Sequence, residues 1–447
     1  MTRRILKYGI TEDGGQGMDY KKLSKAQLEK ELLLQQSRYD KYKAMGLSLD
    51  MTRGKPCAAQ LKLSEPMLDQ ALLEDCTSEN GTDCRNYGVV AGLPEARRFM
   101  GELLGVPGDN IICGGNSSLN MMYDTISAFM LFGVSGDEAD RPWFEEKDRK
   151  FICPVPGYDR HFAVTELFGF KLIPVDINPD GPDMDEIERI VRDDPSVKGM
   201  WSVPKYSNPT GYVYSDECIR RLARMKCAAH DFRIFWDDAY TVHFFNDSPA
   251  DQLNLYDECV KAGNPERTIM FGSTSKITFP GAGIAALAAD KKTVDFLLSK
   301  ISKQTIGPDK LNQLRHVKFL KDLQGVVAHM KKHADIMKPK FDAVQDVFES
   351  EFDAPVEGQL QWTKPEGGYF ICCKTGEGMA AQVLDMCKQC GVAFTPAGST
   401  HPYKKDPTDS YVRIAPSYPE IGQIRSAVEI FCICVKITLI KQLLLSK

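Results

Sequence analysis

Short apolar runs alternate with helix-like segments along the middle of the chain. Runs of three to five mainly apolar residues, each typical of a buried strand, lie at residues 110–113, 151–153, 171–175, 199–203, 234–236 and 268–271. Segments with the apolar spacing of a helix lie between several of them, for example at residues 119–129 and 161–168. Strands that alternate with helices in this way predict a mostly parallel sheet with helices on both faces.

From residue 326 the pattern changes to a long helix, interrupted at most once, that ends near residue 352. The segment 367–372, a helix near 379–390, a strand at 411–414 and a last helix at 424–445 follow it. The last helix has its apolar residues on one stripe, which predicts a helix docked on the protein rather than a membrane span. Near the other end of the chain, Ser24 and Gln27 form a capping box for a helix that runs to about Lys43.

These patterns predict two domains in a chain of 447 residues, a length that allows more than one. The large domain, a three-layer α/β arrangement with a mostly parallel sheet between helices, is expected at residues 81–325. A smaller α+β domain is expected from residues 21–80 together with 326–447. Residues 1–20 are expected to form a flexible N-terminal arm.

Composition excludes several classes of protein. Apolar residues make up 43% and charged residues 26% of the chain, which is ordinary for a soluble protein. The net charge of −5 gives no electrostatic reason to expect a nucleic-acid partner. The first twenty residues lack the apolar core of a secretory signal. We therefore expect a cytoplasmic protein that binds neither nucleic acid nor membrane.

The fourteen cysteines are scattered along the chain, which fits reduced thiols in a cytoplasm. Cys387 and Cys390 have the spacing of half a zinc or redox site, and Cys432 and Cys434 could join them. No second well-spaced pair and no histidine cluster completes such a site, so packing cysteines and no metal are expected.

Polar or charged residues that could take part in binding or catalysis follow four of the predicted strands. Residues 114–118, Gly-Gly-Asn-Ser-Ser, lie between a strand and a helix, where backbone N–H groups and the helix dipole can hold a phosphate; a simple helix cap is the alternative. Asn208 follows the strand at 199–203, and its amide can donate to an anionic oxygen. Asp237 and Tyr240 follow the strand at 234–236, although paired aspartates there also cap helices. Lys276 follows the strand at 268–271.

A single cofactor requires this combination of groups at the carboxyl ends of strands. Pyridoxal phosphate (PLP) needs an amine for its aldehyde, an acid beside its ring nitrogen, donors to its phenolic oxygen and a phosphate cup. Partial desolvation lowers the pKa of a lysine amine at such a place and makes it a nucleophile. The sequence therefore predicts a PLP site centred on Lys276.

The chain resembles the fold-type I PLP-dependent aminotransferases of the class I/II superfamily over nearly its whole length. The segments that carry the resemblance are residues 87–97, 114–118, 208–211 (Asn-Pro-Thr-Gly), 237–240 (Asp-Asp-Ala-Tyr), 273–276 (Ser-Thr-Ser-Lys), 365–369 (Pro-Glu-Gly-Gly-Tyr) and Arg413. Residues 51–56, 154–160 and 204–211 are more narrowly similar to the bacterial aspartate aminotransferases of subgroup Ic, relatives of the aminotransferase module of MocR-type regulators.

The resemblance implies roles for individual residues. Lys276 would be the Schiff-base lysine and proton shuttle, Asp237 would keep the ring nitrogen protonated, and Asn208 and Tyr240 would hydrogen-bond the phenolic oxygen. Arg413 would pair with the substrate α-carboxylate in a bidentate geometry that lysine does not offer, next to Gly54 and Asn208. The remaining cofactor contacts would come from Tyr158, stacked on the ring, and from Gly115, Asn116, Ser117, Ser118 and Ser273 at the phosphate. Tyr87 would reach the phosphate of a partner subunit, which implies a homodimer.

The resemblance also implies ping-pong transamination between an amino acid and a 2-oxoacid, in this subgroup L-aspartate and 2-oxoglutarate to oxaloacetate and L-glutamate. Arg53, Lys55 and Arg141 are candidates for a partner of the substrate's second carboxylate, with a solvated surface position as the alternative for each. An alanine, aromatic or other 2-oxoacid aminotransferase, and a β-lyase on the same fold, stay open.

Two other functions are considered, and one segment of the chain differs from the family pattern. A PLP-sensing regulator would need a DNA-binding domain of about 60–80 residues, and only about 50 residues precede Arg53. An inactive relative is disfavoured because the set of Lys276, Asp237, Asn208 and Arg413 is intact. Family members usually pair an arginine with the phosphate in a Gly-x-Arg-x-Gly segment, whereas residues 280–284 read Pro-Gly-Ala-Gly-Ile, with no arginine near Ala282.

Overall fold

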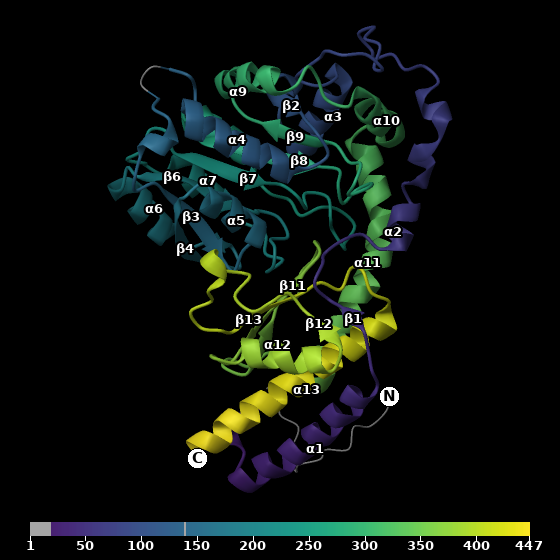
Figure 1. Cartoon of the computed structure of the whole chain (residues 1–447), viewed down its shortest axis with the longest axis vertical. Coiled ribbons are helices and arrows are strands. Elements are labelled where there is room, and N and C mark those ends of the chain that lie inside the picture. The colour runs from purple at the N-terminus through teal and green to yellow at the C-terminus, as the bar shows by residue number, and fades with distance from the viewer. Residues whose placement is uncertain (1–18, 138–139) are drawn as a thin grey trace.

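An eight-stranded sheet forms the centre of the larger part of the molecule (Figure 1). The computed structural model describes residues 19–137 and 140–447, so the expected N-terminal arm lies outside the described residues up to residue 18. The sheet has the order β2-β9-β8-β7-β6-β3-β4-β5. Its strands are β2 (Ile111–Cys113), β3 (Lys150–Val155), β4 (Lys171–Asn178), β5 (Gly181–Pro182), β6 (Val197–Ser202), β7 (Arg233–Asp237), β8 (Thr268–Ser273) and β9 (Ala285–Ala288).

The five strands β4, β3, β6, β7 and β8 run parallel, as their alternation with helices predicts. At the two sides of the sheet, β9 is antiparallel to β8 and β2, and β5 is antiparallel to β4. The strand β9 was not expected from the sequence, because its residues Ala-Ala-Leu-Ala have little intrinsic strand preference. Its place between two other strands gives it the pairing that its composition does not favour.

Helices cover both faces of the sheet and complete the three layers (Figure 1). Side chains of β7 divide between the two sides: Phe235 packs in one core cluster, and Ile234 and Trp236 pack in the other. The first cluster lies against α4 (Ser118–Phe132), α5 (Asp159–Leu167) and α9 (Lys291–Gln304). The second lies against α3 (Pro94–Leu104), α6 (Met184–Asp193), α7 (Asp216–Arg224), α8 (Leu255–Lys261) and α10 (Lys310–Leu320). This is the expected α/β fold of PLP transferase type I.

The smaller part of the molecule combines a three-stranded antiparallel sheet with helices from both ends of the chain (Figure 1). Its strands are β10 (Leu360–Trp362), β11 (Ile371–Thr375) and β13 (Tyr411–Ile414), while β1 (Leu49–Asp50) pairs with β12 (Val392–Ala393). Its helices are α1 (Lys25–Ala44), α2 (Ala58–Lys62), α12 (Ala380–Gln389) and α13 (Ile421–Ser446).

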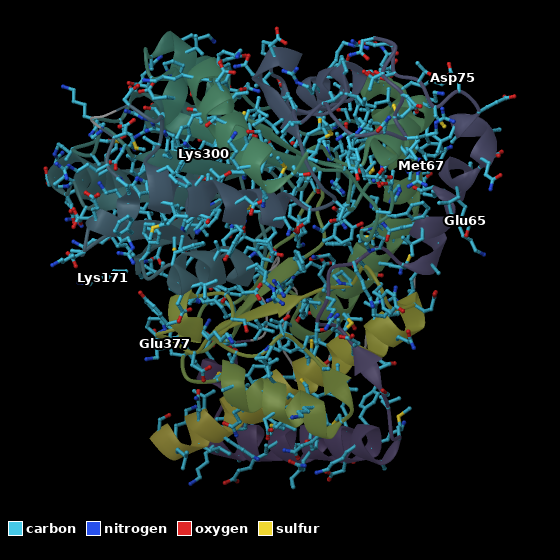
Figure 2. The ribbon with its side chains drawn as sticks, turned by 45° about the horizontal axis from the view of Figure 1, so that its top comes forward. Glu65, Met67, Asp75, Lys171, Lys300 and Glu377 are labelled. Atoms are coloured by element: carbon cyan, nitrogen blue, oxygen red, sulfur yellow. The ribbon has the colours of Figure 1, made fainter. Side chains whose placement is uncertain are left out.

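The long helix α11 (Leu323–Phe352) runs from the large sheet to the smaller part (Figure 1). The expected long helix is confirmed and has no interruption, because it continues through Pro339. The chain between α2 and α3 follows one side of the molecule, where Figure 2 labels Glu65, Met67 and Asp75, opposite Lys171 of β4. The capping box at the start of α1 is confirmed, with the Ser24 and Gln27 side chains each accepting from the other's backbone N–H.

The last helix, α13, is buried more completely than one apolar stripe predicts. Every residue from 430 to 440 is buried, because α1, α11 and α12 all pack against this helix. Lys436 lies within this stretch and forms an ion pair with Glu351 of α11 at 2.6 Å. In the part of the chain that the structure describes, no helix has both the length and the apolar character that a membrane crossing requires.

All fourteen cysteines are free thiols. Cys387, Cys390, Cys432 and Cys434 are buried where α12 and α13 pack together. Within residues 19–137 and 140–447, no three or more His, Cys, Asp or Glu side chains are grouped so that they could hold a metal ion.

Candidate active site

Three of the predicted residues meet at the carboxyl ends of neighbouring strands. Asn208 follows β6, Asp237 is the last residue of β7, and Lys276 follows β8. These strands are adjacent and parallel in the order β8-β7-β6, so their carboxyl ends lie at one edge of the sheet. Ligands of open α/β sheets bind at this edge.

Asp237 has one carboxylate oxygen bound and one left open. Its Oδ2 lies 2.9 Å from Nε2 of His161, while Oδ1 is buried and has no hydrogen-bond partner among the described residues. The next residue, Asp238, accepts a hydrogen bond from the Thr241 hydroxyl at 2.7 Å and so stabilises the turn that follows β7. The described residues 238–254 contain no helix, so neither aspartate is the helix cap considered as the alternative, and Oδ1 of Asp237 is available to a donor.

His161 is a site residue that the sequence did not reveal. It lies in the first turn of α5, stacks on Trp201 with 4.3 Å between ring centroids, and meets the edge of Tyr158 at 4.9 Å. Its position three residues after Tyr158, at the start of a helix, was the available signal, because residues i and i+3 share a helix face. His161 thus connects the aromatic ring expected to stack on the cofactor with the acid expected at the ring nitrogen.

Lys276 lies beside the rings of two tyrosines. Its Nζ is 4.9 Å from the ring centroid of Tyr240 and 6.0 Å from that of Tyr369. Burial lowers the pKa of Lys276, and the negative charge of Asp237 partly opposes this. Burial also raises the pKa of Tyr240 well above its ordinary value, so this phenol stays protonated and can donate. The arrangement offers a reactive amine next to a hydrogen-bond donor.

Arg413, on β13, is held for a carboxylate. Its Nη1 donates to Oδ1 of Asn208 at 3.2 Å and its Nη2 to the Thr395 hydroxyl at 3.1 Å, while Nε is buried without a partner among the described residues. Asp159 lies 3.5 Å from Nη1. Because the oxygen of the Asn208 amide faces Arg413, its NH₂ group is left for another acceptor.

The ring of Phe370 lies close to both Gly54 and Arg413. The Phe370 ring is 4.7 Å from the Arg413 guanidinium carbon, and a Cβ on Gly54 would come within 2.4 Å of the same ring. Only glycine fits this approach. The neighbouring Lys55 places its ammonium 3.9 Å from the Tyr418 ring centroid, and Arg53 is exposed.

The residues predicted to hold a phosphate gather at the start of α4. Ser117 is the N-cap residue of this helix, and its side chain makes no cap hydrogen bond, so the first N–H groups of α4 are not satisfied by this side chain. Gly115 is exposed, Ser118 begins α4, and Ser273 ends β8. The Asn116 side chain donates one hydrogen of its amide to the Gly281 carbonyl at 3.1 Å, which leaves the second amide hydrogen and the backbone N–H for a phosphate.

The segment 280–284, which lacks an arginine, packs closely against the lysine loop. A Cβ on Gly283 would lie 3.0 Å from the backbone nitrogen of Ser275 and 3.1 Å from the Thr274 hydroxyl. Asn312 of α10 fixes the segment from the other side by donating to the carbonyls of Ala282 and Gly283. A larger side chain at Gly283 would have to displace these neighbours.

Two predicted residues lie apart from this cluster. Tyr87 is 79% exposed, so most of its side chain faces solvent in the single subunit. Arg141 has the solvated surface position given as its alternative: its side chain is 82% exposed and pairs with Glu145, in the segment that enters β3 at the opposite edge of the sheet.

The buried, unpartnered Oδ1 of Asp237 fits the protonated ring nitrogen of PLP, and the amine of Lys276 fits its aldehyde. Comparisons with known proteins agree with this chemistry. The family model described as aspartate amino-transferase matches residues 23–446.

The chain belongs to this aminotransferase family.

The similarity extends over almost the whole length of known relatives. A protein named aspartate aminotransferase from Corynebacterium glutamicum is 42% identical over 89% of this chain and 91% of its own length. The crystal structure of an aspartate transaminase from the same organism superposes with a TM-score of 0.90 at 39% identity, covering 95% of this chain and 99% of that one.

A more distant structure shares the fold alone. The α-aminoadipate aminotransferase LysN of Thermus thermophilus, complexed with N-(5'-phosphopyridoxyl)-L-leucine, has a TM-score of 0.71 at 20% identity over 95% of this chain and 96% of its own. Together with the family match, these comparisons show that this aminotransferase is a PLP-dependent enzyme that acts on amino-acid and 2-oxoacid substrates.

Proposed function

We propose that this aminotransferase moves the amino group of L-aspartate to 2-oxoglutarate, producing oxaloacetate and L-glutamate in two half-reactions. The observation that carries the proposal is the 42% identity, over 91% of its length, with the Corynebacterium glutamicum protein named aspartate aminotransferase. The pocket chemistry supports binding of an amino acid, because the buried Nε of Arg413 has no partner among the described residues and is available to a carboxylate.

PLP, when bound, supplies an aldehyde that accepts the amino group and a ring that accepts the electrons of the substrate's α-carbon. Asp237 would hold the proton on the ring nitrogen through its open Oδ1, while His161 holds the other oxygen. Lys276 would carry the proton between the α-carbon and the carbon of the aldehyde, because its lowered pKa makes the neutral amine available. Asn208 and Tyr240 would donate to the phenolic oxygen, and Tyr158 would cover one face of the ring.

Arg413 would bind the α-carboxylate and orient the amino acid for proton transfer. For the second carboxylate of aspartate we favour Arg53, since it is exposed and adjoins Gly54. No ion pair of its guanidinium occurs within the described residues. Lys55 is engaged with the Tyr418 ring.

The phosphate would be held by the N-terminus of α4, through Gly115, the backbone of Asn116, Ser117 and Ser118, and by Ser273. We further propose a homodimer in which the exposed Tyr87 of one subunit reaches the phosphate of the other. The predicted division, with a large domain at residues 81–325 and a smaller one at 21–80 and 326–447, and a cytoplasmic location belong to the same proposal.

A screen of amino donors against 2-oxoglutarate tests the substrate. We expect aspartate to convert the bound cofactor to its amino form much faster than alanine, phenylalanine or tyrosine. An Arg53→Met variant should lose most of the preference for aspartate over alanine, while Lys55→Met should keep it. If alanine or an aromatic acid reacts and aspartate does not, the aspartate assignment is wrong; release of pyruvate and ammonia from a β-substituted substrate would instead identify a β-lyase.

A further inference from the structure

Four of the seven histidines in the chain are buried around the loop that carries Lys276. These are His243, His316, His329 and His333, with 5%, 0%, 6% and 2% of their surface exposed. None of them has a part in the chemistry described so far. Neutral buried imidazoles need hydrogen-bond partners, and the partners of two of them lead directly to the catalytic loop.

A chain of contacts starts at the residue after the lysine. The carbonyl of Ile277 accepts a hydrogen bond from Nε2 of His329 at 3.0 Å, and Nε2 of His333 lies 3.2 Å from that same nitrogen. The Gln60 amide nitrogen is 3.1 Å from Nδ1 of His333 and also donates to the Tyr369 hydroxyl at 3.1 Å. The Tyr369 ring centroid in turn lies 6.0 Å from Nζ of Lys276, so the chain runs from the residue after the lysine to a ring near its amine.

The hydrogen-bonding capacity of these groups fixes the protonation states. A carbonyl only accepts, so Nε2 of His329 carries the hydrogen that Ile277 receives. The Gln60 amide donates to Nδ1 of His333, so the hydrogen of His333 lies on Nε2 and is directed at the same Ile277 carbonyl; the two Nε2 atoms at 3.2 Å are neighbouring donors and not a hydrogen-bonded pair. Burial lowers the pKa of His329, and burial together with His329 lowers the pKa of His333 to about 3. Both imidazoles are therefore neutral at neutral pH and add no positive charge beside Lys276.

The groups in this chain come from four separate parts of the fold. His329 and His333 lie one turn apart on α11, Gln60 lies on α2, Tyr369 precedes β11, and Ile277 lies in the loop after β8. A cavity of about 10 Å³ beside His333 and Gln60 is at the lower limit for one water molecule, so the side chains are closely packed. The lysine loop is thus tied to the helix that joins the two parts of the molecule.

We propose that His329 and His333 are positioning residues for Lys276. By holding the Ile277 carbonyl they fix the backbone that carries the lysine, and Gln60 and Tyr369 pass this constraint to α2 and the small sheet. The proposal rests on the catalytic role proposed above for Lys276. It assigns to the histidines the placement of the amine during proton transfer, and no part in substrate affinity.

Two substitutions at His329 separate this role from simple packing. His329→Leu removes the N–H that Ile277 receives, whereas His329→Gln keeps an amide N–H at about the same distance along the side chain. Met330→Leu changes a buried neighbour on the same turn without touching a hydrogen bond, and serves as the packing control.

We expect His329→Leu to lower kcat by about 10- to 100-fold, because small displacements of a reacting group cost rates of this order. The KM for the amino acid should change less than about 3-fold, since Arg413 is untouched. His329→Gln and Met330→Leu should keep most of the wild-type kcat.

A second measurement uses the cofactor-free protein. The pH at which Lys276 becomes half-reactive toward an amine-reactive reagent, followed by mass spectrometry, should rise in His329→Leu toward that of an ordinary lysine. It should stay near the wild-type value in His329→Gln. If the Leu variant does not fold, Gln60→Met removes the amide that holds His333 and should change kcat and the labelling midpoint in the same direction.

The proposal is overturned if the Leu and Gln variants lose the same activity, since packing would then explain the loss. It is equally overturned if both keep the wild-type kcat and labelling midpoint. Wild-type protein that takes up no PLP would instead refute the role of Lys276 and with it the proposed function. A visible cofactor band in the wild type, lost in Lys276→Ala, confirms the lysine independently of the histidines.

Discussion

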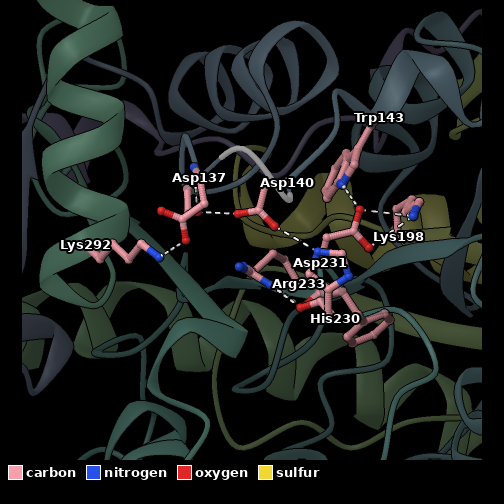
Figure 3. Close-up of polar contacts among 10 residues, drawn as sticks. Asp137, Asp140, Trp143, Lys198, His230, Asp231, Arg233 and Lys292 are labelled. Atoms are coloured by element: carbon pink, nitrogen blue, oxygen red, sulfur yellow. Dashed lines mark hydrogen bonds and ion pairs between the residues drawn. The ribbon is translucent and has the colours of Figure 1, made fainter.

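Two buried aspartates flank the same strand, β7, and differ in how completely they are bonded. Asp231 precedes the strand and uses both oxygens, with the Lys198 ammonium and the Trp143 indole N–H each at 3.0 Å (Figure 3). Asp237 ends the strand and uses one oxygen, with His161, while its Oδ1 has no partner among the described residues. The two residues are about equally buried, at 5% and 4% exposure.

This difference indicates that the aspartate at the amino-terminal edge of the sheet stabilises the fold, whereas the aspartate at the carboxyl-terminal edge can bind a ligand. A buried carboxylate without its full set of partners costs stability, so folded proteins rarely leave one open. At the amino-terminal edge, Asp231 receives its partners from the protein itself. At the carboxyl-terminal edge, the missing donor of Asp237 matches the ring nitrogen of the cofactor.

The largest expected effect is on stability at Asp231. Asp231→Ala leaves the largely buried Lys198 side chain without its counter-charge. Removing one partner of a fully buried pair costs about 3–5 kcal/mol of unfolding free energy, and we expect a loss toward the lower end of this range. Denaturant titration of the variant should show this loss, while kcat per folded molecule stays unchanged. Asp231→Asn, which keeps an acceptor for Trp143, should lose less. Equal stability of the wild type and the Ala variant would contradict the comparison.

The opposite pattern is expected at Asp237. Asp237→Asn removes the charge that keeps the ring nitrogen protonated, and losing one such preorganised electrostatic contact lowers kcat by about 10²–10³-fold. The cofactor-free variant should be at least as stable as the wild type, because an unsatisfied buried charge has been removed. Steady-state kinetics and thermal unfolding of the same preparation test both statements. A variant that is destabilised yet fully active would reverse the assignment of the two ends.

The next largest effect is the dependence of stability on pH, which the buried histidines cause. Burial lowers the pKa of His243 and His333 to about 3 and that of His316 to about 4. Below pH 6.5 the unfolded chain binds protons that the folded chain refuses, so stability is lost as the pH falls from about 6.5. Each histidine contributes up to about 1.4 kcal/mol per pH unit.

Denaturant midpoints at pH 7.5, 6 and 5 should reveal this slope. His316→Gln should reduce it by the share of one histidine. An unaltered slope in His316→Gln would show that this ring is not neutral in the folded protein.

The smallest effect on stability is expected for an exposed ion pair at the border of the polar side chains drawn around Asp231 (Figure 3). Lys292 and Asp137 form an ion pair there (Figure 3), but both side chains are more than half exposed. Water and salt screen such pairs, so Lys292→Ala should leave the midpoint of thermal unfolding unchanged within error. A clear loss of stability in Lys292→Ala would mean that exposure does not decide how much an ion pair at this edge contributes. The greater expected contribution of Asp231 would then need another explanation.

The sequence predicted the strands that carry the site because their apolar runs are local signals. Their parallel order then placed Asn208, Asp237 and Lys276 at one edge by a rule that needs no coordinates. Strand β9 was not predicted because its alanines have little preference for a strand. Helix α13 is buried on more than its predicted apolar stripe because three other helices pack against it. His161 was missed because its spacing from Tyr158 is only a weak signal, and its partner Asp237 lies 76 residues away in the sequence.

The sequence by itself determined the alternation of strands and helices, the family, the cofactor and the residues proposed to touch it. These follow from local pattern and from motifs whose order along the chain is specific. Only the tertiary structure decided which polar groups are satisfied. It joined Asp237 to His161, left Oδ1 open, and tied the carbonyl next to Lys276 to His329, 52 residues further along the chain. Such contacts depend on the packing of distant segments, and packing is a property of the folded chain as a whole.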